Sequence, residues 1–308
     1  MGELRRRHQP GEQFRRRDRR STRHEAGTSH CASLATHARP ARHTEAMQLL
    51  YRESAAHAGP TAGAPDGLGE DDLRELYAWP TDRRWLRANM VASLDGMARG
   101  PDGRSGSMSG EADKLVFAML RQTADAVLVG AGTAAAEDYG PVKVRPAWAG
   151  WRREAGQAPS PPIVVVTNRA RLDPAARLFN GARGSVCVVV GQAAPDDRVA
   201  ALRDVADVMV VPTPRVQATA LLELLAHRGW LRVLTEGGPT LLGDLLGVVD
   251  DLCLTTAPLV VGGSPAARPA PDLLDGRVLA HERDAKLAHV ILAEGAMLQR
   301  WQLGDDTG

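Results

Sequence analysis

Cysteine is scarce in this sequence, and long apolar runs are absent. The 308 residues include three cysteines, Cys31, Cys187 and Cys253, which lie far apart and form no C-x-x-C pair. This spacing argues against a structural zinc site, a thioredoxin-like centre and a disulfide framework, and it suits a reducing cytoplasm. No apolar run approaches the roughly 20 residues that a membrane-spanning helix requires. We therefore expect a soluble cytoplasmic protein that binds no metal and contacts no membrane.

Positive charge is concentrated near the amino terminus. Residues 1–46 hold eleven arginines and five acidic residues, whereas 27 of the 38 basic and 32 of the 37 acidic residues lie beyond them. Because residues 1–70 also lack a sustained hydrophobic period, we expect a disordered basic tail there and one larger folded domain at residues 71–308. The arginine runs in the tail are physically compatible with a nucleic-acid arm. A passive tail is the simpler interpretation, so no nucleic-acid partner is expected.

Short β-branched runs alternate with helical patterns from Trp85 onward. The periodicity predicts helices at Glu111–Gln122, Val216–Arg228 and Thr240–Leu246. This alternation favours an α/β fold with a mostly parallel central sheet and helices on both faces. The predicted strands are Trp85–Ala92, Ala126–Val129, Ile163–Thr167, Ser185–Val190, Val208–Val211, Arg232–Thr235, Asp251–Ala257, His289–Ala293 and, as an edge strand, Met297–Leu303.

The first informative motif is the tetrapeptide SLDG, residues 93–96, which directly follows a predicted strand. Gly96 is free to adopt a positive φ, so the tetrapeptide predicts a turn. The turn would place the Ser93 hydroxyl and the Asp95 carboxylate at a strand end, where α/β sheets form their ligand crevice. By itself, the motif is more typical of a plain Asx-turn with a solvated serine.

The second motif is the glycine-rich sequence GAGT, residues 130–133, at the end of another predicted strand. Such turns let backbone N–H groups approach a phosphate without interference from a Cβ atom. The dinucleotide fingerprint G-x-G-x-x-G is not met, because Ala135 stands where the third glycine is expected. Alone, this motif is more typical of an ordinary strand-to-helix turn.

The third motif is LTEGGPTLL, residues 234–242, in which a strand ends in an acid and two glycines follow. Pro239 stands where the first helical turn should begin. The start of a helix attracts a pyrophosphate, and Thr240 adds a hydroxyl donor. Glu236 would repel that pyrophosphate, so it is better placed to meet a substrate. A tight strand-turn-helix junction explains the motif equally well.

Taken together, in this order and spacing, the three motifs resemble the reductase domain of the riboflavin-biosynthesis deaminase-reductases and their monofunctional actinobacterial relatives. The resemblance covers residues 75–305, with WLRANMVASLDG, SGSMSGEADKLVFAMLR, ADAVLVGAGT, LTEGGPTLL and DLCLTTAPLVVGG as its sharpest segments. It implies a dihydrofolate-reductase-like fold and a pyrimidine reductase that takes a hydride from NADPH. The implied reaction converts 5-amino-6-(5-phosphoribosylamino)uracil to its ribitylamino form.

The resemblance also implies the residues that contact substrate. Glu236 is expected to meet the pyrimidine and Asp95 to lie near the reacting centre, and these two are the candidate catalytic carboxylates. Lys143 is the alternative to Arg145 as a phosphate ligand. The full set expected at the substrate is Ser105, Arg121, Arg145 and Glu236.

A second set is implied at the cofactor. Arg169 is expected to pair with the 2′-phosphate, which would select NADPH over NADH. The glycines at 237 and 238 are expected to cradle the pyrophosphate. The full set is Val91, Ser107, Thr133, Glu137, Asn168, Arg169, Gly237, Gly238, Thr240 and Leu241.

One departure from the bifunctional proteins leaves alternatives open. Their zinc deaminase carries an H-x-E and P-C-x-x-C signature, which this sequence lacks. Reduction of dihydrofolate or a related pterin on the same scaffold therefore stays open, as does an NADPH-binding protein without catalysis. Family members commonly dimerise by extending their sheets edge to edge, so we expect a homodimer in which residues 289–303 supply the edge.

Overall fold

The computed structural model describes residues 46–53, 58–59, 67–262, 272–274 and 281–304. The chain divides into two compact units, residues 1–41 and 42–308. Everything described below belongs to the second unit. No helix in the described ranges is long and apolar enough to cross a membrane.

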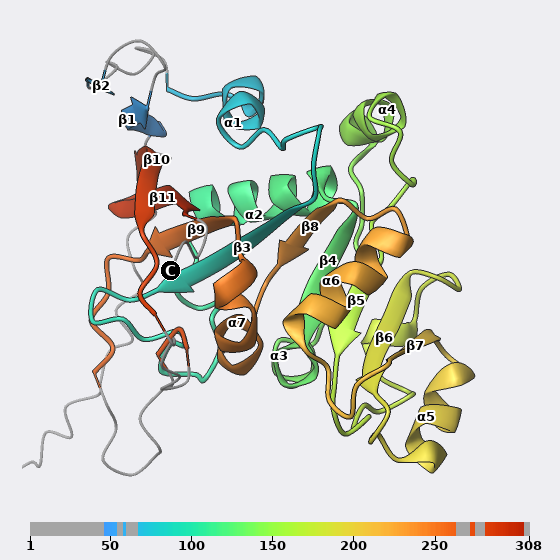
Figure 1. Ribbon diagram of the computed structural model, residues 1–308. Helices are drawn as coiled ribbons and strands as arrows, with labels where there is room; N and C mark the ends of the chain where they lie inside the picture. The colour runs from blue at the N-terminus through green and yellow to red at the C-terminus, as the bar shows by residue number, and fades with distance from the viewer. Residues whose placement is uncertain (1–45, 54–57, 60–66, 263–271, 275–280, 305–308) are drawn as a thin grey trace, which may run out of the picture. The chain divides into compact units, whose positions relative to one another are not determined.

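The described residues form one sheet of eleven strands, in the order β2-β1-β10-β11-β9-β3-β8-β4-β5-β6-β7 (Figure 1). Seven neighbouring strands are parallel: β9 (Asp251–Thr256), β3 (Trp85–Ala92), β8 (Arg232–Thr235), β4 (Ala126–Gly130), β5 (Ile163–Val166), β6 (Val186–Gly191) and β7 (Asp207–Val211). The other four add antiparallel pairs beyond β9: β11 (Ala296–Leu303), β10 (Ala285–Ala293), β1 (Gln48–Glu53) and β2 (Ala58–Gly59).

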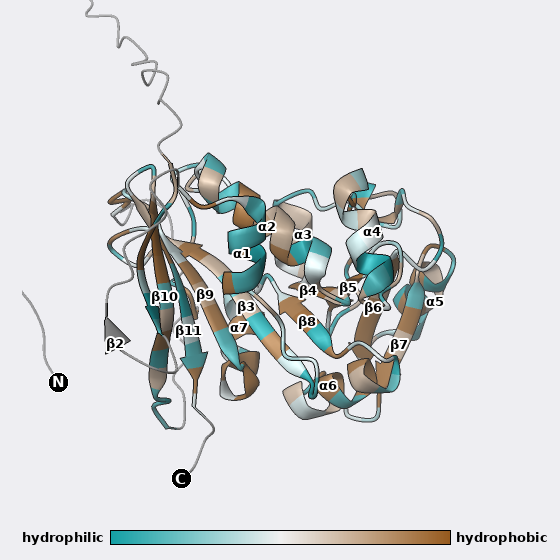
Figure 2. Ribbon diagram, turned by 90° about the horizontal axis from the view of Figure 1, so that it is seen from above, coloured by the Kyte–Doolittle hydropathy of each residue, from teal (hydrophilic) through white to brown (hydrophobic). Residues whose placement is uncertain are grey.

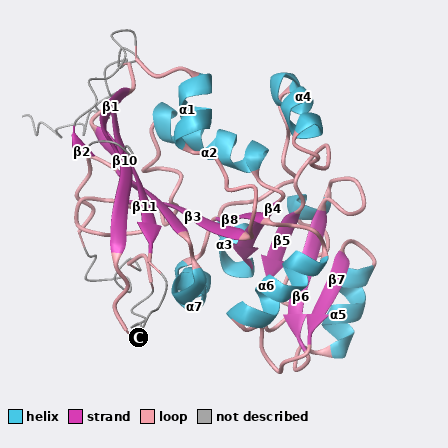
Figure 3. Ribbon diagram, turned by 45° about the horizontal axis from the view of Figure 1, so that its top comes forward, coloured by secondary structure: helices cyan, strands magenta, loops and turns pink. Residues whose placement is uncertain are grey.

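Helices cover both faces of the sheet (Figure 3). One face is packed by α6 (Ala218–His227) and α7 (Pro239–Leu245), whose leucines join the alternate residues of β3, β4 and β8 in one core cluster. The other face carries two clusters, built by α1 (Glu70–Leu76), α2 (Glu111–Thr123), α3 (Ala131–Ala136), α4 (Pro146–Glu154) and α5 (Asp196–Arg203). The predicted α/β fold class is therefore confirmed.

Burial on both faces explains the composition of the central strands. Ile163 and Val165 of β5 point to one core, and Val164 points to the other. A strand buried on both sides reads as a continuous apolar run rather than as an alternating one. Figure 2 shows this as brown on β5 and β6.

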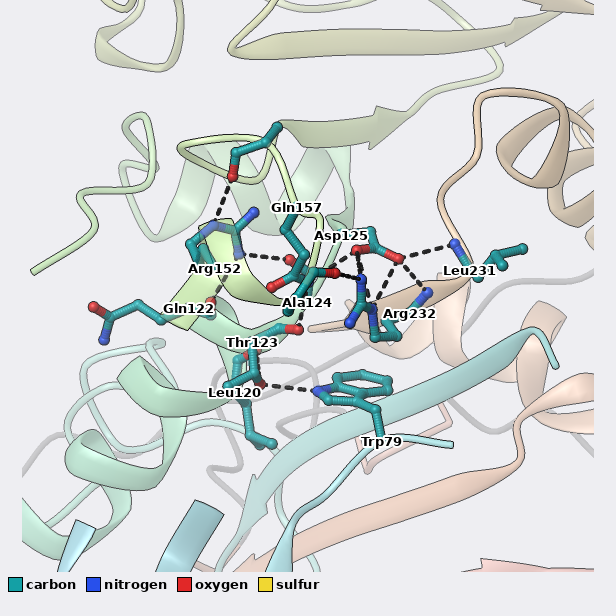
Figure 4. Close-up of polar contacts among 12 residues, drawn as sticks. Trp79, Leu120, Gln122, Thr123, Ala124, Asp125, Arg152, Gln157, Leu231 and Arg232 are labelled. Atoms are coloured by element: carbon teal, nitrogen blue, oxygen red, sulfur yellow. Dashed lines mark hydrogen bonds and ion pairs between the residues drawn. The ribbon is translucent and has the colours of Figure 1, made fainter. Parts of the chain in front are cut away.

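A polar network joins the amino-terminal ends of β4 and β8 and the end of α2 (Figure 4). Asp125, just before β4, accepts hydrogen bonds from the backbone N–H groups of Leu231 (3.1 Å) and Arg232 (2.8 Å). The Arg232 guanidinium also pairs with Asp125, at 2.9 Å. Arg152, which is fully buried, donates to the carbonyl oxygens of Gln122 and Ala124 at the end of α2, each at 2.8 Å. Burial lowers the pKa of Arg152 to about 10.

Two expectations about the chain's outer parts are corrected by the structure. The expected tail at residues 1–70 ends too late, because residues 48–53 form β1 and pair with β10. Residues 1–45 lie outside the described residues. Residues 289–303 do not form an edge either, because β10 lies between β1 and β11, and β11 lies between β10 and β9. Pairing with β1 could not be foreseen from a segment whose strand pattern is so short.

Candidate active site

A cavity of about 600 Å³ opens where α2 crosses the carboxyl end of β3. Asn89 and Val91 of β3 form the floor of the cavity, and side chains of α2 form one wall. The segment from Glu137 to Arg145 closes the opposite side. Because β3, β8 and β4 are parallel neighbours, their carboxyl ends meet at this place, as ligand crevices do in such sheets.

The first residue after β8, Glu236, lies in the cavity wall and is held by two partners. Arg121 of α2 donates to both of its oxygens, Nε to Oε1 and Nη2 to Oε2, each at 2.6 Å. The Tyr139 hydroxyl donates to Oε2 as well. The Arg121 guanidinium also lies over the rings of Phe117 and Tyr139, 4.2 and 5.0 Å from their centroids. Planar contacts of this kind fix an arginine in one orientation.

Burial and charge set the proton affinities of this group. Burial by itself lowers the pKa of Arg121, but the charge of Glu236 and their hydrogen bonds outweigh it and raise the pKa overall. Burial, followed by the charge of Glu236, raises the pKa of Tyr139 well above its usual range. Tyr139 therefore remains a neutral hydrogen-bond donor at any physiological pH.

The glycine-rich turns after β4 and β8 lie side by side. The Gly130 N–H donates to the Gly237 carbonyl oxygen at 2.8 Å. Gly237 and Gly238 have φ values of +67° and +65°. A Cβ atom on Gly238 would stand 2.5 Å from the Thr133 hydroxyl oxygen, closer than non-bonded atoms approach. Residue 238 must therefore carry no Cβ atom, because α7 and α3 come together at this position.

A second carboxylate ties the loop after β3 to α3. Glu137 Oε1 accepts hydrogen bonds from the backbone N–H of Ser105 (2.8 Å) and from its hydroxyl (3.0 Å). Both residues line the cavity, as does Thr133. The structure therefore brings together three residues that the sequence assigns to two different ligands.

Cationic side chains surround the mouth of the cavity. Lys143 is exposed and has no ionic partner among the described residues. Arg145 pairs with Glu70 at 3.2 Å, and both side chains are about half exposed. Lys114 pairs with Glu111 at 2.8 Å. Ion pairs this exposed are weak, so these cations remain available to an anionic ligand.

Some residues expected at the site lie away from the cavity lining. Asp95 is exposed, and it accepts hydrogen bonds from the Ser93 hydroxyl (2.6 Å) and from the backbone N–H groups of Val261 (3.1 Å) and Gly262 (2.7 Å). These bonds, with that of Ser93 the strongest, lower the pKa of Asp95 to about 2. The alternative of an Asx-turn with a solvated serine is wrong, because Ser93 is buried and its hydroxyl closes the turn by accepting from the Met97 N–H at 3.0 Å. Asp95 instead joins the end of β3 to the chain after β9.

The remaining expected cofactor residues are spread along the same edge of the sheet. The Ser107 hydroxyl donates to Asp102 at 2.7 Å. Asn168 Oδ1 accepts from the Val216 N–H at 2.8 Å, which ties the end of β5 to the start of α6. Arg169 is exposed. Two further residues lie on α7, Leu241 in the core and Thr240 exposed.

The cavity lining includes polar residues that were not expected from the sequence, among them Asn89, Asp113 and Tyr139. Asn89 shares a sheet face with Val91 by the alternation of β3, so its position was readable in principle. Asp113 lies in a helix that was predicted, but the pattern does not say which polar position faces a strand. Tyr139 lies beyond the end of α3, where the sequence does not say which way the chain turns.

Residues 84–290 match the model of the RibD C-terminal domain. This chain belongs to that family. Two archaeal relatives are each named 2,5-diamino-6-ribosylamino-4(3H)-pyrimidinone 5′-phosphate reductase. The protein of Archaeoglobus fulgidus is 33% identical over 63% of this chain and 87% of its own length. That of Methanothermobacter thermautotrophicus is 36% identical over 66% of this chain and 89% of its own length.

Longer proteins and solved structures agree with this assignment. The riboflavin biosynthesis protein RibD of Mycobacterium tuberculosis is 30% identical over 63% of this chain, which corresponds to 48% of that protein. The crystal structure of a pyrimidine reductase-like protein from Corynebacterium diphtheriae has a TM-score of 0.66 at 27% identity, over 76% of this chain and 99% of the other. The family and the oxidoreductase class expected from the sequence are thus confirmed.

Proposed function

We propose that this chain uses NADPH to reduce the sugar of a ribosylaminopyrimidine 5′-phosphate to the ribityl form. The observation that carries the proposal is the cavity in which carboxylates and cations meet at the carboxyl ends of β3, β8 and β4, with the glycine turns after β4 and β8 beside it. The two archaeal relatives, named as reductases of such a phosphate, support it. Their substrate has an amino group at C2 of the ring, where 5-amino-6-(5-phosphoribosylamino)uracil has a carbonyl group.

The residues present fit a dinucleotide. The adjoining turns at Gly130 and Gly237–Gly238 offer backbone without side chains, and Gly132 beside them has open space around its Cα atom. Thr133 adds a hydroxyl at the same place, and Arg169, exposed after β5, is free to meet a 2′-phosphate. When bound, NADPH supplies the hydride. The protein supplies the orientation of the sugar against it.

The substrate's phosphate would lie at the cationic mouth. Lys143 and Arg145 are our candidates for holding it, since Lys143 has no ionic partner in the described part of the chain and Arg145 has only an exposed one. Arg121, expected at the phosphate from the sequence, already donates two hydrogen bonds to Glu236. Its proposed role is therefore to hold Glu236 against the substrate.

Reduction requires the ribosylamine to open to an imine, which then accepts a hydride at C1′ and a proton at nitrogen. Glu236 is held in one position in the cavity wall, where its carboxylate would orient the pyrimidine. Closure of the cavity by the Ser105 loop, fastened by Glu137, would exclude water from the imine. Asp95, at the outer turn, keeps the end of β3 in place, and its expected role at the reacting centre remains a prediction.

The test is NADPH oxidation by the full-length chain, followed by absorbance, with three substrates offered side by side. These are the 2,5-diaminopyrimidinone ribosyl phosphate, its uracil counterpart and dihydrofolate. Turnover of either pyrimidine, with recovery of the ribitylamino product, is the expected result. Turnover of dihydrofolate alone would establish the pterin alternative, which the relatives' names do not favour. NADPH binding without turnover of any of the three would point to a non-catalytic protein.

A further inference from the structure

Four carboxylates line the cavity, and three of them are committed to partners. Glu236 is held by Arg121 and Tyr139, and Glu137 accepts two hydrogen bonds from Ser105. The third, Asp138, pairs with the Arg177 guanidinium at 2.9 Å. The fourth is Asp113 in the first turn of α2, and it has no cationic partner among the described residues.

Asp113 is buried, with 6% of its surface exposed. Its Oδ1 accepts a hydrogen bond from the Thr255 hydroxyl at 2.6 Å, which joins α2 to β9. Oδ2 has no partner in the described part of the chain. This oxygen reaches the solvent of the cavity, so it is able to accept a hydrogen bond from a ligand bound there.

The surroundings of Asp113 suit the ring of a substrate better than a phosphate. Thr255 is the β9 partner of Val91, and Asn89 lies two residues earlier on β3, on the same face. The Asn89 side-chain amide has no hydrogen-bond partner among the described residues, and both β3 residues line the cavity. The floor therefore combines an apolar surface with one free acceptor and one free amide, a combination suited to a planar, polar ring. The cations lie at the mouth instead.

We propose that Asp113 is a specificity-determining residue that accepts a hydrogen bond from an amino group at C2 of the pyrimidine. The inference rests on the function proposed above and names the ring it selects. A 2-aminopyrimidinone presents an N–H donor at C2, which suits a carboxylate oxygen. A uracil presents a carbonyl oxygen there, which a carboxylate repels. The 5-amino group is present in both rings and cannot distinguish them.

The experiment compares kcat/KM for the 2,5-diaminopyrimidinone ribosyl phosphate with that for the uracil counterpart, in the full-length protein. We expect the wild-type protein to prefer the diamino substrate. Asp113→Asn offers an amide N–H to the carbonyl oxygen, so the preference should fall on the order of 10- to 100-fold, the range expected when one hydrogen bond to a charged group is lost. KM for NADPH should stay unchanged. A ratio measured in one preparation is independent of the fraction of folded enzyme.

Two further variants control the experiment. Glu111→Gln makes the same chemical change two residues away on α2, on a side chain that is 74% exposed, and should keep the wild-type ratio. Thr255→Val leaves the carboxylate but removes the hydrogen bond that orients it, so the preference should fall by less than in Asp113→Asn. If Asp113→Asn does not fold, Thr255→Val decides, and an unchanged ratio in it overturns the inference.

The failures of the inference and of the proposed function are distinguishable. A wild-type protein that turns over both rings equally, or prefers the uracil, overturns the role of Asp113 while the reductase function stands. An Asp113→Asn protein with the wild-type ratio does the same. A wild-type protein that reduces neither pyrimidine overturns the proposed function itself, and the inference with it.

Discussion

Arg121 and Glu236, 115 residues apart in the sequence, form a pair with two hydrogen bonds of 2.6 Å. Only 20% of the arginine side chain and 2% of the glutamate side chain are exposed. The hydrogen bonds of this pair have good geometry, but both charges have lost their hydration. The pair therefore adds little to folding stability compared with an apolar pair of similar size. Removing one partner alone destabilises the fold much more, because the other charge stays buried without its counter-charge.

The first prediction concerns this pair. Arg121→Met should lower the free energy of unfolding by about 3–5 kcal/mol, because the buried Glu236 carboxylate is left without its cation. Adding Glu236→Gln should recover much of that loss while abolishing reductase activity. Urea denaturation of both single variants and the double variant gives the coupling energy directly. Additive losses would show that the two side chains do not depend on each other.

The second prediction concerns the glycine turns. Gly238→Ala should raise Kd for NADPH at least tenfold and lower stability by about 1–2 kcal/mol, since its φ is +65° and its Cβ would collide with Thr133. Gly229→Ala is the matched control, because its φ is also positive, +75°, and a Cβ there, in the turn after α6, meets nothing within 4 Å. Fluorescence titration with NADPH measures both. Equal affinities in the two variants would disprove a phosphate site at Gly238.

The third prediction concerns the choice between NADPH and NADH. Arg169 is exposed beyond β5, and its guanidinium has no partner among the described residues. Arg169→Ala should reduce the ratio of kcat/KM for NADPH to that for NADH by about tenfold or more, since a charge-assisted bond to phosphate is lost. Arg171→Ala, exposed two residues further on, should leave the ratio unchanged. If both variants behave alike, the 2′-phosphate is read elsewhere.

The fourth prediction concerns acid stability. His289 is buried, and burial together with Arg300 and Arg87 lowers its pKa to about 3. Between that value and about 6.5 the unfolded chain binds a proton that the folded chain does not, so stability falls as the pH falls through this window. The loss should reach at most about 1.4 kcal/mol per pH unit. His289→Phe should flatten this dependence in urea denaturation at pH 7.5, 6 and 5.

The control for this prediction is His227, which is exposed on α6. His227→Gln should keep the slope of the wild-type protein. An identical slope in His289→Phe would mean that other groups cause the acid dependence.

The central sheet was predictable because its strands are buried on both faces. Trp85–Ala92 and Arg232–Thr235 match β3 and β8 at both ends, since apolar runs bounded by turn residues leave little ambiguity. The helix α1 was missed because only Leu73 and Leu76 anchor its seven residues, and short helices owe their stability to such tertiary contacts. The homodimer and the cytoplasmic location stay predictions.

The site was predictable in part, for a topological reason. Residues that directly follow parallel strands must gather at one edge, and Thr133, Glu236 and Gly238 do so. No such rule places the side chains of a helix that packs on the face of the sheet. The pairing of Arg121 with Glu236 and the position of the Asp113 carboxylate both depend on how α2 is rotated about its own axis over β3. A sequence pattern fixes that rotation only roughly.

Strand β8 is four residues long, and an arginine-carboxylate ion pair lies at each of its ends. Asp125 fixes Arg232 at its start, and Arg121 fixes Glu236 just after its last residue. The strand thus acts as a rigid spacer that sets how far the Glu236 carboxylate extends into the cavity. Loosening the far end, by a change at Asp125, would shift that carboxylate along the strand axis, so a substitution at the opposite end of β8 from the cavity would alter catalytic efficiency.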